Sequence, residues 1–377
     1  MSLLVILFWV SLALVFYIYA GYPLCIGLLA RCFPRETRKE PNKLTATVII
    51  SIYNERSGLS DKLRNLLSIA ESDRIVQILI GSDGSTDHPE SVIEAFNDSR
   101  LQLASFPGRR GKPSVLNDLI PQATGDILIM MDVRQRLDNH VIPALMDNFS
   151  DSTVGVVSGE LIFERLEGDT SVAGGIDAYW RYEKWLRDHE GRVHSVPGAT
   201  GALYAIRREL AKPIPTEAAL DDVLIPMLAI AQGYRCIFEP AAIIYDRPAQ
   251  STDREAIRKR RTLAGCVQLL KYYPKWVLPF GHPIWWQYGS HKISRLFSPW
   301  LLFLTYLSSA LLVQQSFFLM MLILQTGCYV LGIAGTKIKN TPRPLAWMGF
   351  FLAMQATLLR AWLDGITRRN LALWNRA

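Results

Sequence analysis

Charged side chains are absent from residues 1–30 and from residues 296–336. At about 20 residues per membrane crossing, the first stretch is long enough to span a bilayer once and the second about twice. The first stretch also lacks the basic start and the small-residue cleavage site of a secretory signal, which favours an uncleaved anchor over a signal peptide. We therefore expect an integral protein of the inner or plasma membrane with a soluble middle.

Several patterns that would point to other classes of protein are missing. The five cysteines are scattered without the spacing of a metal site, so we expect reduced, structural thiols. The glycines form no GxGxxG fingerprint, which argues against a dinucleotide cofactor. The net charge is +7, but the basic residues cluster beside the apolar stretches and no nucleic-acid-binding motif is present. This distribution favours membrane lipids as a partner and no nucleic acid.

A basic segment with Arg31, Arg35, Arg38, Lys39 and Lys43 follows the first apolar stretch. Basic flanks stay on the cytosolic side of a membrane, so we expect the middle domain to be cytosolic. The predicted organisation is an N-terminal transmembrane helix at residues 1–30, a basic cytosolic linker at 31–43, a cytosolic domain at 44–273, interfacial helices at 274–295, C-terminal transmembrane or re-entrant helices at 296–365 and a basic tail at 366–377.

The last apolar region contains a predicted helical hairpin, 296–313 and 317–335, that turns at Gln314 and Gln315. A third apolar segment, 345–359, is followed by several arginines. If this segment spanned the membrane, those arginines would lie outside, against the positive-inside rule. A spanning placement and an interfacial or re-entrant placement therefore both stay open.

The middle of the chain alternates short apolar runs with amphipathic segments, which are typical of buried strands and helices respectively. This alternation predicts an α/β domain with a mostly parallel, Rossmann-like sheet and helices on both faces. Strands are predicted at residues 45–52, 76–80, 101–106, 127–131, 154–163 and 235–245, and helices at 59–70, 89–96, 114–123, 170–188, 219–234 and 253–273.

Polar residues gather where four consecutive predicted strands end. They are Tyr53, Asn54 and Glu55 after the first strand, Asp83 after the second, the basic loop 108–113 after the third and Asp132 after the fourth. A single aspartate at a strand end is explained as readily by a turn or a helix cap. Four such strand ends at one edge favour a ligand site, because open α/β sheets bind ligands beyond the carboxyl ends of their strands.

Two charged groups in the second half of the domain suit a general base and a pyrophosphate partner. Asp221 and Asp222 fall in the first turn of a predicted helix, where the helix dipole alone favours acidic residues. A pair of carboxylates can also raise the pKa of one partner and so supply a general base. In the basic helix, Arg258 and Arg261 share a face through their i, i+3 spacing, and a pyrophosphate partner explains the basic set better than solvated charge does.

With these residues in place, the chain resembles the membrane-integrated, inverting family-two glycosyltransferases, which include cellulose, hyaluronan and chitin-oligosaccharide synthases. The resemblance covers about residues 45–270 and extends to the membrane flanks. It implies a cytosolic A-type glycosyltransferase domain, a nucleotide-sugar donor that is a UDP-sugar in many members, and Mg²⁺ or Mn²⁺ as cofactor. It also implies a lipid-linked or polysaccharide acceptor, and it leaves open a homo-oligomer or export partners.

The resemblance gives the donor-binding motifs their roles. It assigns the nucleotide sugar to Tyr53, Asn54, Glu55 and Asp83 around the uridine, to Lys112 and Asn117 near the diphosphate, and to Arg258 and Arg261 of the Q-x-x-R-W position. Asp132 matches the first carboxylate of the D-x-D metal motif. These motifs occur in the family's order, which makes the set far more specific than any one motif.

The acceptor side is assigned in the same way. Thr200 and Gly201 lie in a glycine-rich segment that resembles the family's acceptor-binding segment. Asp221 and Asp222 resemble its acidic pair, in which the first member contacts the acceptor region and the second is the catalytic base.

The chain departs from the family at two motifs. Arg134 stands where the D-x-D motif has its second carboxylate, and we hypothesise that this cation supplements or partly replaces metal charge. The Q-x-x-R-W position keeps Arg261 but has Arg258 in place of the glutamine and Thr262 in place of the tryptophan. Because that tryptophan packs near the acceptor in the family, its loss puts processive elongation in doubt.

Three functions are consistent with these residues and with the family resemblance. The first is an inverting hexosyl- or N-acetylhexosaminyltransferase that acts on a membrane-proximal acceptor in exopolysaccharide or lipid-linked glycan synthesis. The second is a processive polysaccharide synthase that works as an oligomer. The third, from a different class, is a non-catalytic nucleotide-sugar-binding subunit of a membrane assembly.

Overall fold

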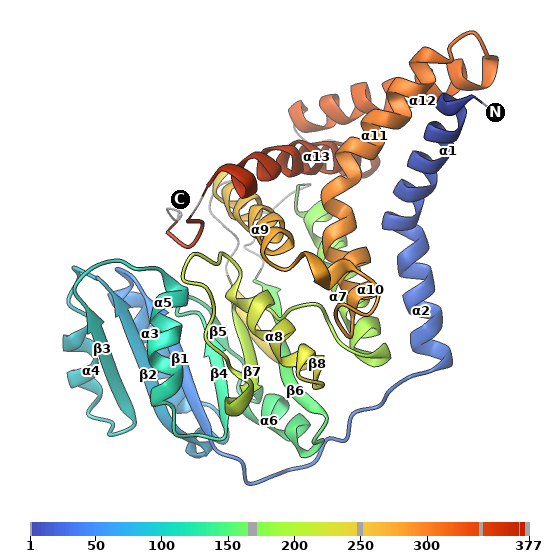
Figure 1. Ribbon diagram of the computed structural model, residues 1–377. Coiled ribbons are helices and arrows are strands. Elements are labelled where there is room, and N and C mark those ends of the chain that lie inside the picture. The colour runs from blue at the N-terminus through green and yellow to red at the C-terminus, as the bar shows by residue number, and fades with distance from the viewer. Residues whose placement is uncertain (1, 165–171, 247–251, 339–341, 369, 374–377) are drawn as a thin grey trace.

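The computed structural model describes the chain except residues 1, 165–171, 247–251, 339–341, 369 and 374–377. The described residues form an eight-stranded sheet in the order β3-β2-β1-β4-β7-β6-β8-β5 (Figure 1). The strands are β1 (Ala46–Ile52), β2 (Ile75–Asp83), β3 (Leu101–Phe106), β4 (Ile127–Met131), β5 (Arg136–Leu137), β6 (Val154–Phe163), β7 (Leu203–Arg207) and β8 (Arg235–Asp246).

The sheet is parallel in its first half and mixed in its second. β3, β2, β1 and β4 pair in parallel, as the sequence predicts. β7 then runs antiparallel to both β4 and β6, while β6 and β8 pair in parallel and β5 pairs antiparallel with β8. The parallel half brings the carboxyl ends of β1, β2 and β4 to one edge of the sheet, where the predicted site residues follow.

Helices cover both faces of the sheet, and β4 shows why. Its five residues are all buried, and they alternate between two hydrophobic clusters, as a strand buried on both faces requires. Ile127, Ile129 and Met131 pack with α3 (Arg56–Ser68) and α6 (Val141–Met146), on the face that also carries α4 (Glu90–Phe96).

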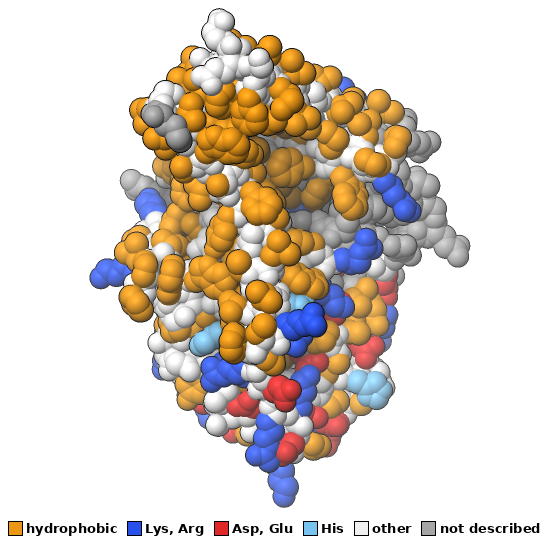
Figure 2. Space-filling model, turned by 90° about the vertical axis from the view of Figure 1, so that its right-hand side faces the viewer, with side chains coloured by type: hydrophobic (Ala, Val, Ile, Leu, Met, Phe, Trp, Pro, Cys, Tyr) orange, Lys and Arg blue, Asp and Glu red, His pale blue; other side chains and the backbone are white. Residues whose placement is uncertain are grey.

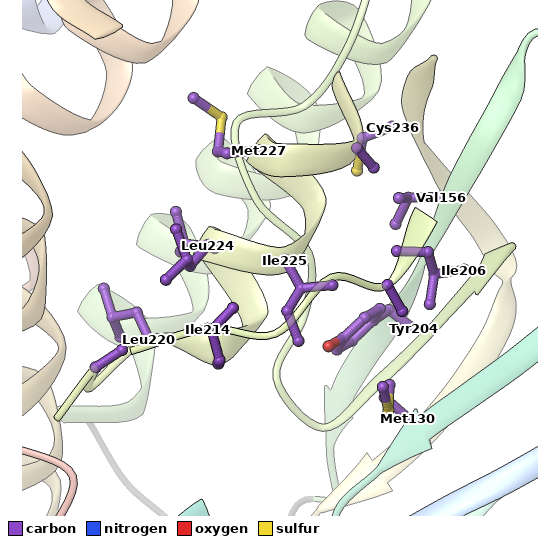
Figure 3. Packing of buried hydrophobic residues seen from close by; sticks show 14 of the residues in the cluster. Met130, Val156, Tyr204, Ile206, Ile214, Leu220, Leu224, Ile225, Met227 and Cys236 are labelled. Carbon is purple, nitrogen blue, oxygen red and sulfur yellow. The ribbon is translucent and has the colours of Figure 1, made fainter. Parts of the chain in front are cut away.

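The other two residues of β4 serve the second face. Leu128 and Met130 pack with α5 (Lys112–Leu119) and α8 (Asp221–Ala231). Figure 3 shows this second cluster, with Met130 and Tyr204 on the sheet facing Ile225 of α8.

Long helices extend away from the sheet (Figure 1). α1 (Leu3–Phe16), η1 (Tyr17–Gly21) and α2 (Tyr22–Cys32) form one continuous helical stretch. The later helices are α7 (Val172–Val193), α9 (Thr252–Tyr272), η6 (Pro274–Val277), α10 (Trp285–Gln287), η7 (Tyr288–Ile293), α11 (Ser294–Leu311), α12 (Ser316–Lys337) and α13 (Arg343–Thr367).

Among the described residues, two helical stretches are long and apolar enough to cross a membrane, Leu3–Cys32 and Ser316–Lys337. Their side chains are largely exposed, as those of Phe16 and Ile323 show. In Figure 2 hydrophobic side chains cover the upper part of one face of the molecule, and charged side chains gather below them. The four residues between α11 and α12 include Gln314 and Gln315, where the sequence predicts the turn of a hairpin.

The third C-terminal segment, residues 345–359, lies within the single helix α13. This helix packs against α12 through close glycine contacts and then continues onto α9 of the α/β domain. Asp364 near its end pairs with Arg260 of α9, and Gly365 abuts Val267. α13 therefore connects the apolar helices to the α/β domain directly.

A buried arginine fastens the basic linker to the domain. Arg235, at the start of β8, is only 2% exposed. Its guanidinium donates to the carbonyl of Arg35 at 2.9 Å and to that of Gly191 at 3.1 Å. It also donates to the carbonyls of His194 and Glu36. A guanidinium has five N–H donors, so one side chain satisfies carbonyls of both the linker and the end of α7.

Replacing Arg235 by methionine should leave these carbonyls without their donors. We expect the Arg235→Met variant to lose about 3 kcal/mol of stability, seen as a clearly lower midpoint of thermal unfolding of the purified protein. Arg64→Met is the matched control, because the Arg64 side chain is 70% exposed and makes a surface ion pair. Equal midpoints for the two variants would contradict the role given to Arg235.

Candidate active site

A cleft of about 1060 Å³ opens at the carboxyl ends of β1, β2 and β4. Nearly all residues that the sequence assigns to the site line it. They are Tyr53, Glu55, Asp83, Lys112, Asp132, Arg134, Thr200, Gly201, Asp221, Asp222, Arg258 and Arg261. Seven separate segments of the chain thus converge on one cleft, as the strand ends and the charged helices predict.

Asn54 and Asn117 do not line the cleft. Asn54 joins two loops, because its side-chain oxygen accepts the backbone N–H of Thr86 at 2.8 Å. Asn117 was expected near the diphosphate, but its carboxamide donates to the carbonyl of Ile214 at 2.7 Å and accepts the N–H of the same residue at 3.0 Å. Asn117 therefore holds α5 against this loop, whereas the sequence predicts a place for it near the diphosphate.

Asp83 shapes the basic loop that follows β3. Its carboxylate accepts the backbone N–H of Arg110 at 2.7 Å and that of Gly111 at 2.8 Å. The adjacent Gly84 has φ +70°, and a Cβ placed there would lie 2.6 Å from the carbonyl carbon of Gly108. Only glycine allows this close approach of two loops. A carboxylate has about four acceptor positions, so Asp83 keeps capacity for a ligand.

The basic loop also reaches the first predicted motif. The guanidinium of Arg109 lies 4.4 Å from the ring centroid of Tyr53, which is a cation–π distance. The aromatic side chain after β1 and the cations after β3 therefore meet on one side of the cleft.

Lys112 lines the cleft at the start of α5. Its ammonium is 3.2 Å from a carboxylate oxygen of Asp132 and 3.1 Å from one of Asp221. Burial lowers the pKa of the Lys112 ammonium, but the carboxylates of Asp132, Asp221 and Asp222 outweigh it and raise that pKa above its ordinary value. Lys112 is therefore a permanent cation that links the end of β4 to the start of α8.

Asp222 lies beside this group with a different electrostatic character. Burial, with the neighbouring Asp221 carboxylate as the next cause, raises the pKa of Asp222 from 3.8 to about 6. Gly201 leaves space for this carboxylate, since an added Cβ would lie 2.5 Å from one of its oxygens. A carboxylate with a raised pKa that opens into a cleft is suited to take a proton.

The glycine-rich segment is anchored by a residue that the sequence does not single out. Thr200 donates to the carbonyl of Gly159 at 2.7 Å and accepts from the guanidinium of Arg187 at 2.8 Å. Arg187 also donates to the hydroxyl of Ser158 at 2.6 Å. Because Arg187 lies in a helix whose aromatic content suggests core packing, its sequence gives no signal of this role.

Other cleft residues are also absent from the sequence-based set. They are mainly charged or aromatic side chains brought in by tertiary packing: Lys62, Trp180, Glu183, Arg187, Asp246 and Lys292. Leu371 and Ala372, beyond α13, also line the cleft, and Ala372 lies beside Gly111. No spacing pattern in the sequence links these positions to the strand ends.

The cleft offers few ligands for a metal. Within the described residues, no three His, Cys, Asp or Glu side chains are grouped so as to hold an ion. Asp132 is the carboxylate at the predicted metal position. Mg²⁺ is commonly held by one or two carboxylates together with substrate phosphates. The residues therefore fit a divalent ion that is completed by a bound diphosphate, and they do not form a metal cage of their own.

The raised pKa of Asp222 gives a prediction that needs no substrate. Asp222 is partly buried and resists ionisation, so its charged form destabilises the fold above its folded pKa of about 6. We expect Asp222→Asn to raise thermal stability at pH 8 by on the order of 1 kcal/mol, and this gain should shrink as the pH falls through 6 toward 4.

Asp98→Asn is the matched control with the opposite sign. The hydrogen bond from Arg100 lowers the pKa of Asp98, so the ionised carboxylate stabilises the fold at pH 8 and its replacement should lower the melting temperature. Melting curves of both variants from pH 4 to pH 8, recorded without nucleotide, test the assignment. A destabilised Asp222→Asn protein at pH 8 would refute it.

Three comparisons relate this fold and cleft to known proteins. The chain is 23% identical over 236 residues to poly-beta-1,6-N-acetyl-D-glucosamine synthase of Staphylococcus aureus strain COL, an alignment that covers 58% of this chain and 56% of the relative. The synthase of the same name from Staphylococcus epidermidis is 21% identical over 204 residues, which covers 52% and 48%. The chain thus matches about half the length of these curated relatives.

A solved structure resembles the whole chain. The mannosyltransferase of Pyrobaculum calidifontis, solved in complex with GDP-Man and Mn²⁺, superposes with a TM-score of 0.72 over 97% of this chain and 100% of that one, at 21% identity. At this identity the similarity shows the fold, which confirms the predicted A-type glycosyltransferase architecture.

The family model described as glycosyl transferase family 2 matches residues 47–214, which include the strand ends that carry Tyr53, Asp83 and Asp132. This match agrees with the resemblance carried by the sequence motifs. The chain therefore contains a glycosyl transferase family 2 domain.

Proposed function

We propose that this chain is an inverting glycosyltransferase that moves a sugar from a nucleotide sugar to an acceptor at the membrane surface. The observation that carries the proposal is the position of Asp222, whose carboxylate has a raised pKa and shares a cleft with Asp132 and Lys112. The family 2 domain and the named relatives support the same reaction class.

The proposed reaction is a single displacement. Asp222 takes the proton of an acceptor hydroxyl, and the acceptor oxygen bonds to the anomeric carbon of the donor sugar. The bond between that carbon and the diphosphate oxygen breaks, so the configuration inverts and a nucleoside diphosphate leaves. Its raised pKa of about 6 leaves Asp222 deprotonated at neutral pH and still basic enough to accept this proton.

The leaving group is a polyanion, and the cleft supplies cations for it. Lys112 lies on one side of the cleft, and Arg258 and Arg261 of α9 line it as well. A divalent ion, Mg²⁺ or Mn²⁺, held by Asp132 would add Lewis-acid charge stabilisation when bound. The Mn²⁺ in the mannosyltransferase complex supports such an ion.

The donor is proposed as a UDP- or GDP-sugar. Tyr53, Glu55 and Asp83 line the part of the cleft next to β1 and β2, where the nucleoside would bind. The family resemblance favours UDP, whereas the structural relative holds GDP-Man. The transferred sugar is a hexose or an N-acetylhexosamine, and an assay with a panel of nucleotide sugars identifies it.

The acceptor is proposed to be a lipid-linked glycan or a growing exopolysaccharide. Lys292 lines the cleft and lies two residues before the start of α11, which packs against α1. The cleft thus opens next to the apolar helices, which we place in the inner or plasma membrane with the α/β domain on the cytosolic side. Membrane lipids would then surround the entrance for a membrane-bound acceptor.

The relation to poly-beta-1,6-N-acetyl-D-glucosamine synthases favours one alternative, a processive synthase that works as an oligomer or with export partners. Arg258 and Thr262 at the Q-x-x-R-W position favour single additions instead. The length of the product made by the purified protein distinguishes these two functions.

Replacing the base should remove turnover and keep donor binding. We expect Asp222→Asn to lower the rate of transfer by about 10²- to 10⁴-fold while the affinity for nucleoside diphosphate stays within a small factor of wild type. In wild type the rate should fall as the pH drops below about 6, because the base becomes protonated. Asp98→Asn serves as the surface control. Full turnover in Asp222→Asn would contradict the role of Asp222 as the base, and no turnover by purified wild type would favour the non-catalytic subunit.

Arg134 should make transfer by this protein less dependent on metal than transfer by family members that have the second carboxylate of the D-x-D motif. Its exposed side chain lines the cleft two residues after Asp132. We expect wild type to retain weak transfer in excess chelator and Arg134→Ala to lose it, while Arg64→Ala behaves as wild type. If wild type depended completely on metal and Arg134→Ala showed the same dependence, this role of Arg134 would be contradicted.

A further inference from the structure

Lys62 is a buried cation without a partner at the edge of the cleft. It lies in α3, is 2% exposed and contributes to the lining of the cleft. Its ammonium has no hydrogen-bond partner among the residues that the structure describes. A buried, unpaired charge is costly, and proteins seldom keep one unless a ligand completes it.

The packing of α3 fixes where Lys62 lies. Gly58, one turn before it, abuts Val133, since an added Cβ would lie 3.9 Å from that side chain. Asn65, three residues after it, accepts the backbone N–H of Leu137 at 2.6 Å and donates to its carbonyl at 3.2 Å. Residues three and four apart share a helix face, so Lys62 lies along the segment that follows Asp132.

The surroundings of Lys62 explain why it can stay charged. Burial lowers the pKa of the Lys62 ammonium to about 8, and the carboxylates of Asp132 and Asp246 oppose that effect. Asp246 accepts a hydrogen bond from Gln135 at 3.0 Å. Neither carboxylate forms a hydrogen bond with the ammonium itself, so within the described chain Lys62 has acidic neighbours but no bonded acceptor.

The chemistry of the missing partner follows from that of the amine. An ammonium has three donors and no acceptor, so its partner must offer acceptor oxygens, and anionic oxygens are preferred in a buried place. The other lysine near Asp132 is already engaged, because Lys112 pairs with Asp132 and Asp221. Lys62 is therefore the uncommitted lysine on the α3 side of Asp132.

We propose that Lys62 is a further donor-binding residue. Its ammonium binds an anionic oxygen of the donor's diphosphate, on the side of Asp132 opposite Lys112. This inference rests on the proposed function, since the diphosphate is that of the nucleotide sugar. Two lysines and Asp132 then enclose the leaving group, with Arg258 and Arg261 lining the same cleft.

Binding measurements on the full-length purified protein test this role without catalysis. The probes are UDP and GDP, each beside its parent nucleoside, titrated into wild type, Lys62→Met, Lys62→Arg and Lys212→Met. Lys212 is an exposed lysine outside the cleft and serves as the control. We expect Lys62→Met to weaken binding of the preferred nucleoside diphosphate by about tenfold or more, with nucleoside binding unchanged. Lys62→Arg should keep most of the affinity.

Thermal unfolding separates a ligand contact from a structural role. Methionine keeps most of the aliphatic volume of lysine, so removing an unpaired buried charge should leave the melting temperature unchanged or higher. A Lys62→Met protein that melts clearly lower or does not fold would overturn the proposal, as would one that binds the diphosphate as wild type does. If wild type bound neither UDP nor GDP, the proposed function itself would fail, and this inference with it.

Discussion

The cleft depends on one ion-pair arrangement, the ammonium of Lys112 between the carboxylates of Asp132 and Asp221. Without this cation, the end of β4 and the start of α8 would bring acidic side chains together in a partly buried place, where like charges repel strongly. Burial and the Asp221 carboxylate raise the pKa of the neighbouring Asp222, and the Lys112 ammonium limits that rise. The same contact that holds two halves of the domain together thus sets the electrostatics of the site.

Direct packing between helices joins the site to the apolar helices, independently of the basic linker. α13 packs on α12 and on α9, and α9 carries Arg258 and Arg261 on the cleft. The ion pair of Arg260 with Asp364 fixes this junction. A helix that lines the cleft is therefore held by an apolar helix, so the position of the cleft relative to the helices that we place in the membrane follows from direct contacts.

The sequence predicts the first half of the fold and most of the site, because both rest on local patterns. Runs such as residues 127–131 are too short for helices and too apolar for exposed strands, and polar residues at their ends converge wherever the strands are parallel. Asn117 shows the limit of this reasoning, since a carboxamide suits a ligand and a backbone carbonyl equally. Lys62 and Arg187 could not be predicted as cleft residues from the sequence, because only tertiary packing brings their helix faces to the cleft.

The most direct test of this account is to incubate the purified protein with a panel of UDP- and GDP-sugars and a membrane-extracted acceptor. The quantities to measure are the nucleoside diphosphate released and the anomeric configuration of the glycan formed. The account predicts that one donor class is consumed and that the new glycosidic bond is inverted relative to the donor. A product with retained configuration, or no consumption of any donor, would contradict it.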